Sequence, residues 1–498
     1  MKISHFVIAL SFISSLITLP VSAFEHFITR DGAKLMDGEK VFRFAGIHAP
    51  ELHRIEDDAK GVCKADPRGW GQHFKWPTAE EQENWIQAIV GTNQKAMRIY
   101  VLSVEHESDP ACGRQTHILK PQTKDGMPSL NEEAMRVYDR MIYLADKHGL
   151  RLILPFIDHW KWWGGREQLA AFYGEHEDEF YNVYSKTYAA YQSIIRDVVT
   201  RRNTFTGRLY SEEKAIMAWE TGNELKDTNE LFLAKTSAFI KALAPNQLVL
   251  DGTYTRINEF ALNDPNVDMV SNHYYTNVGN NNPETVLTDL TTINGRKPYL
   301  IGEFGLQSSD KLDAIMQAAV STEYKGNKAV GAFIWGFRGH RHNGGFYWHN
   351  EGGSQYYSYH LPGFKEGDFN EEIQVVDIAR KAAAQMMGEK LQPLAAPQAP
   401  VLREITTISD IRWMGAPLGR SYRIERSTQM NDNWQTIAKA VSDGMNKFDP
   451  RIHTLFCDDS AKANTTYYYR VFANNESGES SPSNIQKVTT AKQPARCH

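Results

Sequence analysis

Residues 216–225, IMAWETGNEL, decide the fold of this chain, because they form a short apolar run that ends abruptly in polar residues. Such a run predicts a buried parallel strand whose carboxyl end delivers the Asn223 amide and the Glu224 carboxyl into a pocket. Residues 297–305, KPYLIGEFG, have the same form and carry Glu303 at the end of the apolar run. Catalytic residues of (β/α)8 barrels lie at such strand ends, so the two glutamates indicate paired-carboxylate chemistry.

Apolar runs alternate with amphipathic segments along most of the chain. The runs that predict strands cover residues 40–47, 95–101, 151–157, 216–224, 247–251, 267–271, 297–303 and 329–335. The segments that predict helices begin at Thr78 or cover residues 131–148, 178–201, 228–243, 283–293, 311–324 and 371–387. Eight strands, each followed by a helix or a long loop, predict an α/β protein with a (β/α)8 TIM barrel. A doubly wound open sheet is the alternative, but it would favour a Gly-rich phosphate loop after an early strand, and the sequence has none.

The pattern changes after the last predicted helix. Residues 390–400 are rich in Pro and Ala and predict a linker, and the short alternating runs beyond it are typical of an all-β unit. Residues 467–483, YYYRVFANNESGESSPS, resemble the end of a fibronectin type III domain, which implies a spacer or attachment module without chemistry of its own. The expected domains are a barrel at residues 24–389, a linker at 390–400 and a fibronectin type III-like sandwich at 401–492.

Residues 1–23 predict a secretory signal peptide, with Lys2 near the start, an apolar run from Phe6 to Leu19 and a small-residue site ending at Ala23. A membrane anchor is the alternative, but the apolar run is short for a bilayer span, and no later segment is apolar enough to cross a membrane. We therefore expect an exported protein, secreted or periplasmic, after removal of the peptide near Ala23.

Four cysteines fit an oxidising compartment. Pairing Cys63 with Cys112 and Cys457 with Cys497 is the economical choice among three possibilities, because two cysteines fall in each expected domain. The cysteines and histidines form no cluster with zinc spacing, so we expect neither a metal nor another cofactor.

The charged residues are spread along the chain. The 60 acidic and 55 basic residues give a net charge of -5 and no basic stretch, so we expect no nucleic-acid partner.

Residues 202–210, RNTFTGRLY, precede the Glu224 strand and resemble a motif of a known family. Together with that strand they resemble the endo-β-1,4-mannanases of glycoside hydrolase family 5. The resemblance covers residues 30–388. Other motifs of the family occur at Trp160, His273, Glu303 and Trp335, in the same order along the chain as in the family. The sequence departs from the family pattern at Leu225, where those enzymes usually have Pro. That departure bears on the sugar specificity more than on the type of reaction.

The resemblance implies roles for individual residues. Glu224 would be the general acid/base and Glu303 the nucleophile of a retaining mechanism, with their carboxyl groups about 5 to 5.5 Å apart. Substrate-binding roles would fall to Arg98, His159, Trp160, Asn223, His273, Tyr275 and Trp335. The partner would be a mannan-type polysaccharide or oligosaccharide, bound by a monomer.

Structural alternatives accompany each assignment. The two glutamates could be acids paired with Arg98, Asn223 could cap a helix, and His273, Tyr275 and Trp335 could be core residues. Aromatic residues on predicted loops, including Trp162, Trp163 and Phe346–Trp348, could bind sugar or pack the loops. The histidines at 340, 342 and 349 are expected on a solvated loop, and Glu80, Glu81, Arg296 and Lys297 on solvated faces.

Two rival functions remain open at this stage. The same fold and mechanism could act on β-glucan or another β-linked glycan. A barrel without activity, joined to the fibronectin-like module, could instead bind carbohydrate.

Overall fold

A computed structural model describes residues 22–67, 73–349, 358–364, 371–444, 454–493 and 497. Residues 1–21 of the expected signal peptide lie outside the described residues. Within the described ranges, no helix is both long enough and apolar enough to span a bilayer.

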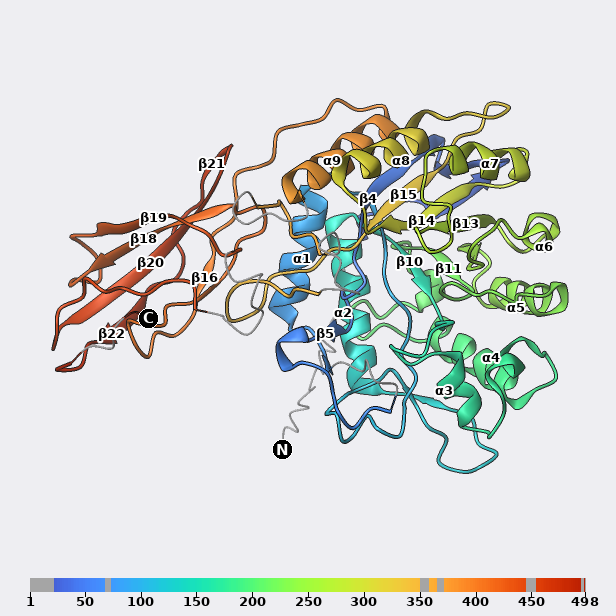
Figure 1. Ribbon diagram of the computed structural model, residues 1–498, viewed down its shortest axis with the longest axis horizontal. Coiled ribbons are helices and arrows are strands. Elements are labelled where there is room, and N and C mark those ends of the chain that lie inside the picture. Colours follow the sequence, from blue (N-terminus) through green and yellow to red (C-terminus); the bar gives the residue numbers. More distant parts are fainter. Residues whose placement is uncertain are drawn as a thin grey trace, which may run out of the picture.

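Eight parallel strands form a nearly closed barrel, in the order β4-β15-β14-β13-β12-β11-β10-β7 (Figure 1). The strands are β4 (Phe44–His48), β7 (Ala96–Arg98), β10 (Arg151–Pro155), β11 (Ile216–Glu220), β12 (Leu248–Asp251), β13 (Met269–Tyr274), β14 (Tyr299–Gly305) and β15 (Gly331–Trp335). The last strand pairs with the first, with Gly331 opposite Phe44 and Trp335 opposite His48. The eight-stranded barrel is confirmed.

Helices surround the barrel. They are α1 (Ala79–Gly91), α2 (Glu132–His148), α3 (Arg166–Ala171), α4 (Lys186–Val199), α5 (Glu230–Leu243), α6 (Glu259–Asn263), α7 (Glu284–Ile293), α8 (Ser309–Ser321) and α9 (Glu372–Met387). Thr78 starts α1 with a capping box: its hydroxyl accepts from the Glu81 amide, and the Glu81 carboxylate accepts from the Thr78 amide. Gly149 ends α2 in the left-handed conformation, at φ 74°, that glycine adopts without strain.

Two predicted elements are broken in the structure. The strand expected at residues 40–47 divides at Arg43, whose side chain donates to the carbonyls of Ala319 and Ala329. The first part, β3 (Lys40–Phe42), joins β1 (Ile28–Asp31) and β2 (Lys34–Asp37) in an antiparallel sheet. The helix expected at 178–201 begins only after Ser185, because this residue caps α4 by accepting from the Tyr188 amide.

The barrel interior is filled by alternate residues of the strands. Phe44, Ala96, Met269 and Phe333 belong to one buried cluster, whereas their chain neighbours pack outward against the helices. Side chains alternate along a strand, so the same inward rows continue toward the carboxyl ends. There they present His48, Arg98, His273 and Trp335.

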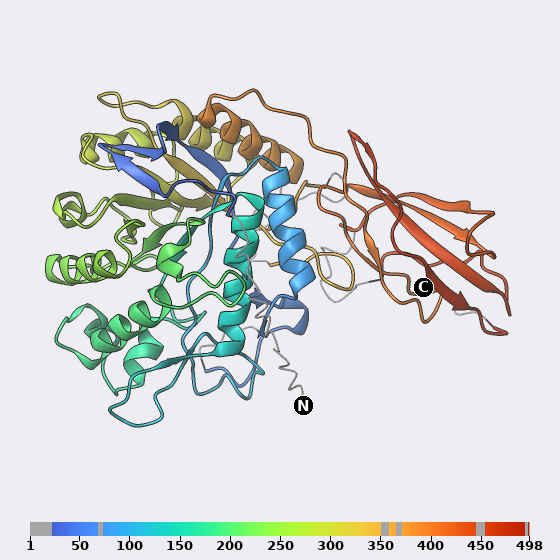
Figure 2. The same cartoon turned by 180° about the vertical axis from the view of Figure 1, so that it is seen from behind.

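A small antiparallel β unit follows the barrel and lies to one side of it, next to α1, in both views (Figure 1 and Figure 2). Its strands are β16 (Val401–Leu402), β17 (Trp413–Met414), β18 (Ser421–Ser427), β19 (Gln435–Val441), β20 (Thr466–Asn475), β21 (Gly478–Glu479) and β22 (Gln486–Thr489). Trp413, Tyr422 and Tyr469 centre its own core. The two disulfides are Cys63–Cys112 and Cys457–Cys497, as the division of the cysteines between the two expected domains predicts.

The expectation of solvated loops and faces is wrong for several residues. His340 is 2% exposed and its ring lies between Asn84, at 2.9 Å, and Asp443 of the β unit, at 3.2 Å. Glu81 and Lys297 are also buried, and both have partners there. The Glu81 carboxylate caps α1, and the Lys297 ammonium donates to two carbonyl oxygens. These polar groups are buried, and their hydrogen bonds connect different parts of the fold.

Leu300 tests the barrel core, because it is fully buried in the inward cluster. The change Leu300→Ala should lower the free energy of unfolding by about 2–5 kcal/mol, the range seen for cavities in packed cores. Leu287→Ala on α7 is the control, since Leu287 is 48% exposed. Urea denaturation of both variants checks the prediction, and equal losses would contradict it.

Candidate active site

A pocket of about 470 Å³ opens at the carboxyl ends of the barrel strands. It is lined by Tyr100, Trp160, Trp162, Asn223, Glu224, Tyr254, Tyr275, Thr276, Asn277, Glu303, Leu306 and Trp335. Acids, amides and aromatic rings thus share one cavity, the composition expected of a site for a polar ring-shaped ligand.

Arg98 lies fully buried at the end of β7 and uses all five of its N–H groups. Its Nε and Nη2 donate to the two oxygens of Glu220 at 2.7 and 2.8 Å, and Nη2 also donates to Asn223 Oδ1 at 2.9 Å. Its Nη1 donates to Glu303 Oε1 at 2.6 Å and to His48 Nε2 at 3.0 Å. Burial acts to lower the pKa of Arg98, but Glu220 and Glu303 raise it overall, so the guanidinium stays charged.

Glu303 lies on β14 and is held from two sides. Arg98 donates to Oε1, and the Tyr275 hydroxyl donates to Oε2 at 2.8 Å. The pKa of Glu303 is raised, because burial and the nearby Glu224 carboxyl outweigh the lowering effects of Arg98 and of the Tyr275 hydrogen bond. These partners favour the carboxylate form and fix its orientation.

Glu224 faces Glu303 from the other side of the pocket. The Trp160 indole donates to its Oε2 at 2.5 Å, and His273 Nδ1 lies 2.9 Å from its Oε1. Burial raises the pKa of Glu224 to about 7, against the Trp160 hydrogen bond and the charges of Arg98 and Lys226. Glu224 can therefore hold a proton near neutral pH, as a general acid must.

The turn that carries Glu224 is tightly held. The backbone N–H of Asn223 donates to Ile157 O at 2.8 Å, and the backbone N–H of Leu225 donates to Gly252 O at 2.9 Å. Both neighbouring strands thereby extend their pairing to this turn. A side chain at position 252 would come within 1.8 Å of Gly222 O, which requires glycine there. Glu224 itself has φ 54°, a left-handed conformation that an L residue keeps only when its surroundings impose it.

His273 connects the two glutamates. Its Nδ1 lies 2.9 Å from Glu224 and 3.6 Å from Glu303 Oε2, and burial lowers its pKa to about 4. A neutral ring at this position shares a hydrogen bond with Glu224 and adds no charge to the site. Gly302 makes room for it, because a side chain there would meet Nε2 at 2.6 Å.

Several site residues were not predicted from the sequence, among them Glu220, Asp158 and Tyr100. Glu220 binds Arg98, and Asp158 accepts from the Asn223 amide at 3.0 Å and from the Tyr100 hydroxyl at 3.0 Å. Burial raises the pKa of Asp158 to about 8. Each residue had a signal: Glu220 is an acid inside an apolar run, Tyr100 lies two positions after Arg98, and Asp158 ends a predicted strand.

The predicted residues occupy different places around the pocket. Asn223, Trp160, Tyr275 and Trp335 line it together with the two glutamates, whereas Arg98 and His273 contact the carboxylates and are not among the lining residues. His159 is 9% exposed, packs edge-on against Trp160 and lies 3.5 Å from the Tyr181 hydroxyl, also outside the lining. Asn223 is not a helix cap, because it continues the pairing of the strands.

Glu224, His273 and Glu303 also have donor atoms close enough to share a metal ion. The Arg98 guanidinium, 2.6 Å from Glu303, would repel a cation there. The geometry therefore fits proton transfer and charge stabilisation better than metal binding.

Comparison with known proteins gives one family match. Residues 90–328 match the model of the glycoside hydrolase family 5 beta-mannosidase-like family. Mannan endo-1,4-beta-mannosidase F of Aspergillus clavatus is 38% identical over 120 residues, which are 23% of this chain and 26% of that protein. The enzyme of the same name from Aspergillus fumigatus is 28% identical over 236 residues, 45% of this chain and 46% of that protein. The matches thus span about a quarter to a half of those relatives.

Solved structures share the barrel. The endo-1,4-beta-mannanase of Rhizomucor miehei has a TM-score of 0.56 at 14% identity, over 73% of this chain and 100% of that chain. The endo-beta-1,4-mannanase of Thermotoga petrophila has a TM-score of 0.53 at 16% identity, over 91% of this chain and 99% of that chain. The structures establish a common fold, and the sequence matches support a glycoside hydrolase of the family 5 mannosidase type.

The raised pKa of Glu224 predicts a change in folding stability with pH. Its pKa is about 7 in the folded state against an ordinary 4.5, so stability present at low pH is lost as the pH rises between these values. Glu224→Gln removes the charge, and should raise the free energy of unfolding at pH 8.5 by about 3 kcal/mol and at pH 4 by almost nothing. Urea denaturation at both pH values measures the difference. Glu389→Gln, at an exposed position, is the control, and an equal gain at pH 4 would contradict the prediction.

Proposed function

We propose that this chain is a retaining β-glycoside hydrolase that cleaves β-1,4-mannan-type polysaccharide with Glu224 and Glu303. One observation carries the proposal: two buried glutamates at the ends of β11 and β14 have carboxylate oxygens within 4.8 Å of each other in one pocket. That spacing fits direct attack on the sugar, since inverting enzymes separate their carboxyl groups by about 6.5–9.5 Å to admit water.

The environments of the two glutamates support different roles. Glu303, held as a carboxylate by Arg98 and Tyr275, attacks the anomeric carbon and forms a covalent glycosyl-enzyme. Glu224, with a pKa of about 7, gives its proton to the departing glycosidic oxygen and then removes a proton from the water that releases the sugar. The proton taken from water restores the acid form of Glu224, and the neutral His273 ring beside both acids adds no charge to the site.

Aromatic rings and one amide support sugar binding. Trp335, Trp160, Trp162 and Tyr254 present faces or edges to the pocket, where apolar sugar faces can stack. Asn223 uses its Nδ2 on Asp158 and Tyr100, so the remaining lone pair of its Oδ1 is the group that can accept from a sugar 2-hydroxyl. The names of the sequence relatives favour mannan, and a β-glucan-type substrate is the second candidate.

The remaining parts of the proposal concern setting and accessory structure. Two disulfides fit an exported, secreted or periplasmic protein. Residues 401–492 serve as a fibronectin type III-like spacer or attachment module, and the protein acts as a monomer.

Changing the nucleophile tests the mechanism. Glu303→Gln should keep the bonds to Arg98 and Tyr275 and retain its melting temperature within a few degrees, but lower kcat on mannan by about a thousandfold or more. Reducing-sugar release from mannan, glucomannan, xylan and carboxymethylcellulose measures activity and substrate together. In the wild type, NMR should show the β anomer as first product. Normal turnover in the variant, or an α product, would overturn the mechanism.

Removing the Trp160 indole N–H tests the role of Glu224. That hydrogen bond lowers the pKa of Glu224, so Trp160→Phe should raise it and move the high-pH limb of kcat/KM to higher pH. Trp162→Phe is the matched control, because Trp162 lines the same pocket. A limb that stays in place or moves to lower pH in Trp160→Phe would show that another group titrates there.

A further inference from the structure

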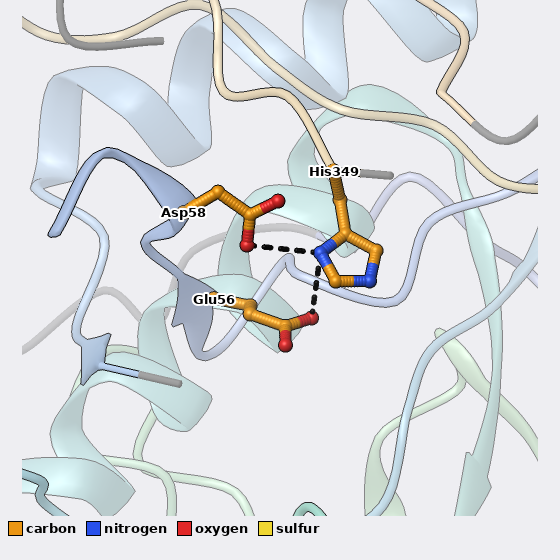
Figure 3. A group of neighbouring side chains, drawn as sticks. All are labelled: Glu56, Asp58 and His349. Atoms are coloured by element: carbon orange, nitrogen blue, oxygen red, sulfur yellow. Dashed lines mark hydrogen bonds and ion pairs between the residues drawn. The ribbon is translucent and has the colours of Figure 1, made fainter. Parts of the chain in front are cut away.

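A second cluster of metal-ligating side chains lies outside the pocket (Figure 3). Glu56 ends β5 (Ile55–Glu56), Asp58 begins the short helix η1 (Asp58–Lys60), and His349 comes from the long loop after β15. His349 Nδ1 lies 3.0 Å from Asp58 Oδ1 and 3.2 Å from Glu56 Oε2. One ring nitrogen thus faces two carboxylates from a segment almost 300 residues away in the chain.

Hydrogen bonding alone does not satisfy this cluster. A ring nitrogen offers one hydrogen in the ring plane, and the hydrogen bond of Nδ1 is to Asp58. Glu56 is 3% exposed, and its Oε2 accepts no hydrogen bond among the residues that the structure describes, although it points at the ring (Figure 3). A buried carboxylate oxygen without a hydrogen bond is costly, and a cation would relieve that cost.

The neighbouring cations are engaged elsewhere. Arg341 and Lys75 both face Asp57, at 3.4 and 3.3 Å, and Arg338 faces Glu51 at 3.6 Å. Among the described residues, the His349 ring is the group in contact with both carboxylates, and Arg338 acts on Glu56 from farther away. Asp58 is the most exposed of the three, with 13% of its side chain open to solvent, which gives an ion a way in.

We propose that Glu56, Asp58 and His349 bind a divalent first-row transition ion of the Zn²⁺ type. With metal–ligand bonds of about 2.1 Å, adjacent donors of an octahedral ion lie about 3.0 Å apart and those of a tetrahedral ion about 3.4 Å apart, which brackets the two measured separations. An imidazole with two carboxylates suits zinc or manganese better than calcium or magnesium, which prefer oxygen alone. The ion would tie the loop after β15 to the loop that contains β5.

A metal-free arrangement competes with this one. Protonated His349 could pair with both carboxylates at the same distances, and Glu56 and Asp58 do raise the pKa of His349 although burial opposes them. The two arrangements differ in metal content and in the response to chelators, so those quantities decide between them.

The test uses the full chain, purified without chelator or affinity tag. Plasma mass spectrometry should find about one Zn²⁺ or Mn²⁺ per chain, or calorimetry should find one Zn²⁺ site in the chelator-treated protein. Chelator should lower the melting temperature by several degrees, and added Zn²⁺ should restore it. His349→Ala, and Asp58→Asn as a milder change, should lose both the ion and the response.

Two controls separate this site from other ones. Glu303→Gln should keep the ion, because it alters only the donors in the pocket. His148→Gln, which alters a partly exposed pair between His148 of α2 and Glu83 of α1, should also keep it. Equal Zn²⁺ binding by His349→Ala and wild type, or a wild type that binds no ion and ignores chelator, would overturn the proposal and leave the protonated pair.

Discussion

The buried guanidinium of Arg98 is the interaction on which the rest of the active site depends. It neutralises one of the two negative charges of Glu220 and Glu303, and it has no hydrogen left for a third acid. A further buried negative charge is strongly disfavoured. Burial accordingly raises the pKa values of Glu224 and Asp158, to about 7 and about 8. Glu224 and Asp158 can thereby hold protons near neutral pH.

The inward rows of the barrel explain why Arg98 can be placed there at all. Its chain neighbour two positions earlier, Ala96, belongs to the apolar cluster that fills the barrel below the site. The same change from apolar to polar occurs between Met269 and His273. The lower layers exclude water and hold the strands in register. The upper layer can then carry buried charges and a left-handed glutamate, both of which cost folding stability.

The predictable parts of this molecule are those that follow from local pattern. Alternation of apolar runs with helical segments indicates eight strands, and the Gly-Asn-Glu and Gly-Glu strand ends point to Glu224 and Glu303. Glu220 is harder to predict, because its meaning depends on Arg98, which lies 122 residues away in the chain. His340 was misjudged for the same reason: its partners, Asn84 and Asp443, come from α1 and from the β unit, and only the folded chain unites them. Long-range pairing of polar groups leaves no periodic trace in a sequence.

The loop after β15 links the pocket to the rest of the molecule. It begins beside Trp335, the ring at one wall of the pocket, and Phe337 then donates to His48 O at 2.7 Å on the first barrel strand. Farther along, His340 contacts the β unit, and His349 meets Glu56 and Asp58. Ordering a loop costs conformational entropy. Each of these contacts restricts the positions that the loop beside Trp335 can adopt. The β unit also holds α1, since Asn84 donates to Gly415 O at 2.7 Å. The β unit therefore contacts both α1 and the loop after β15.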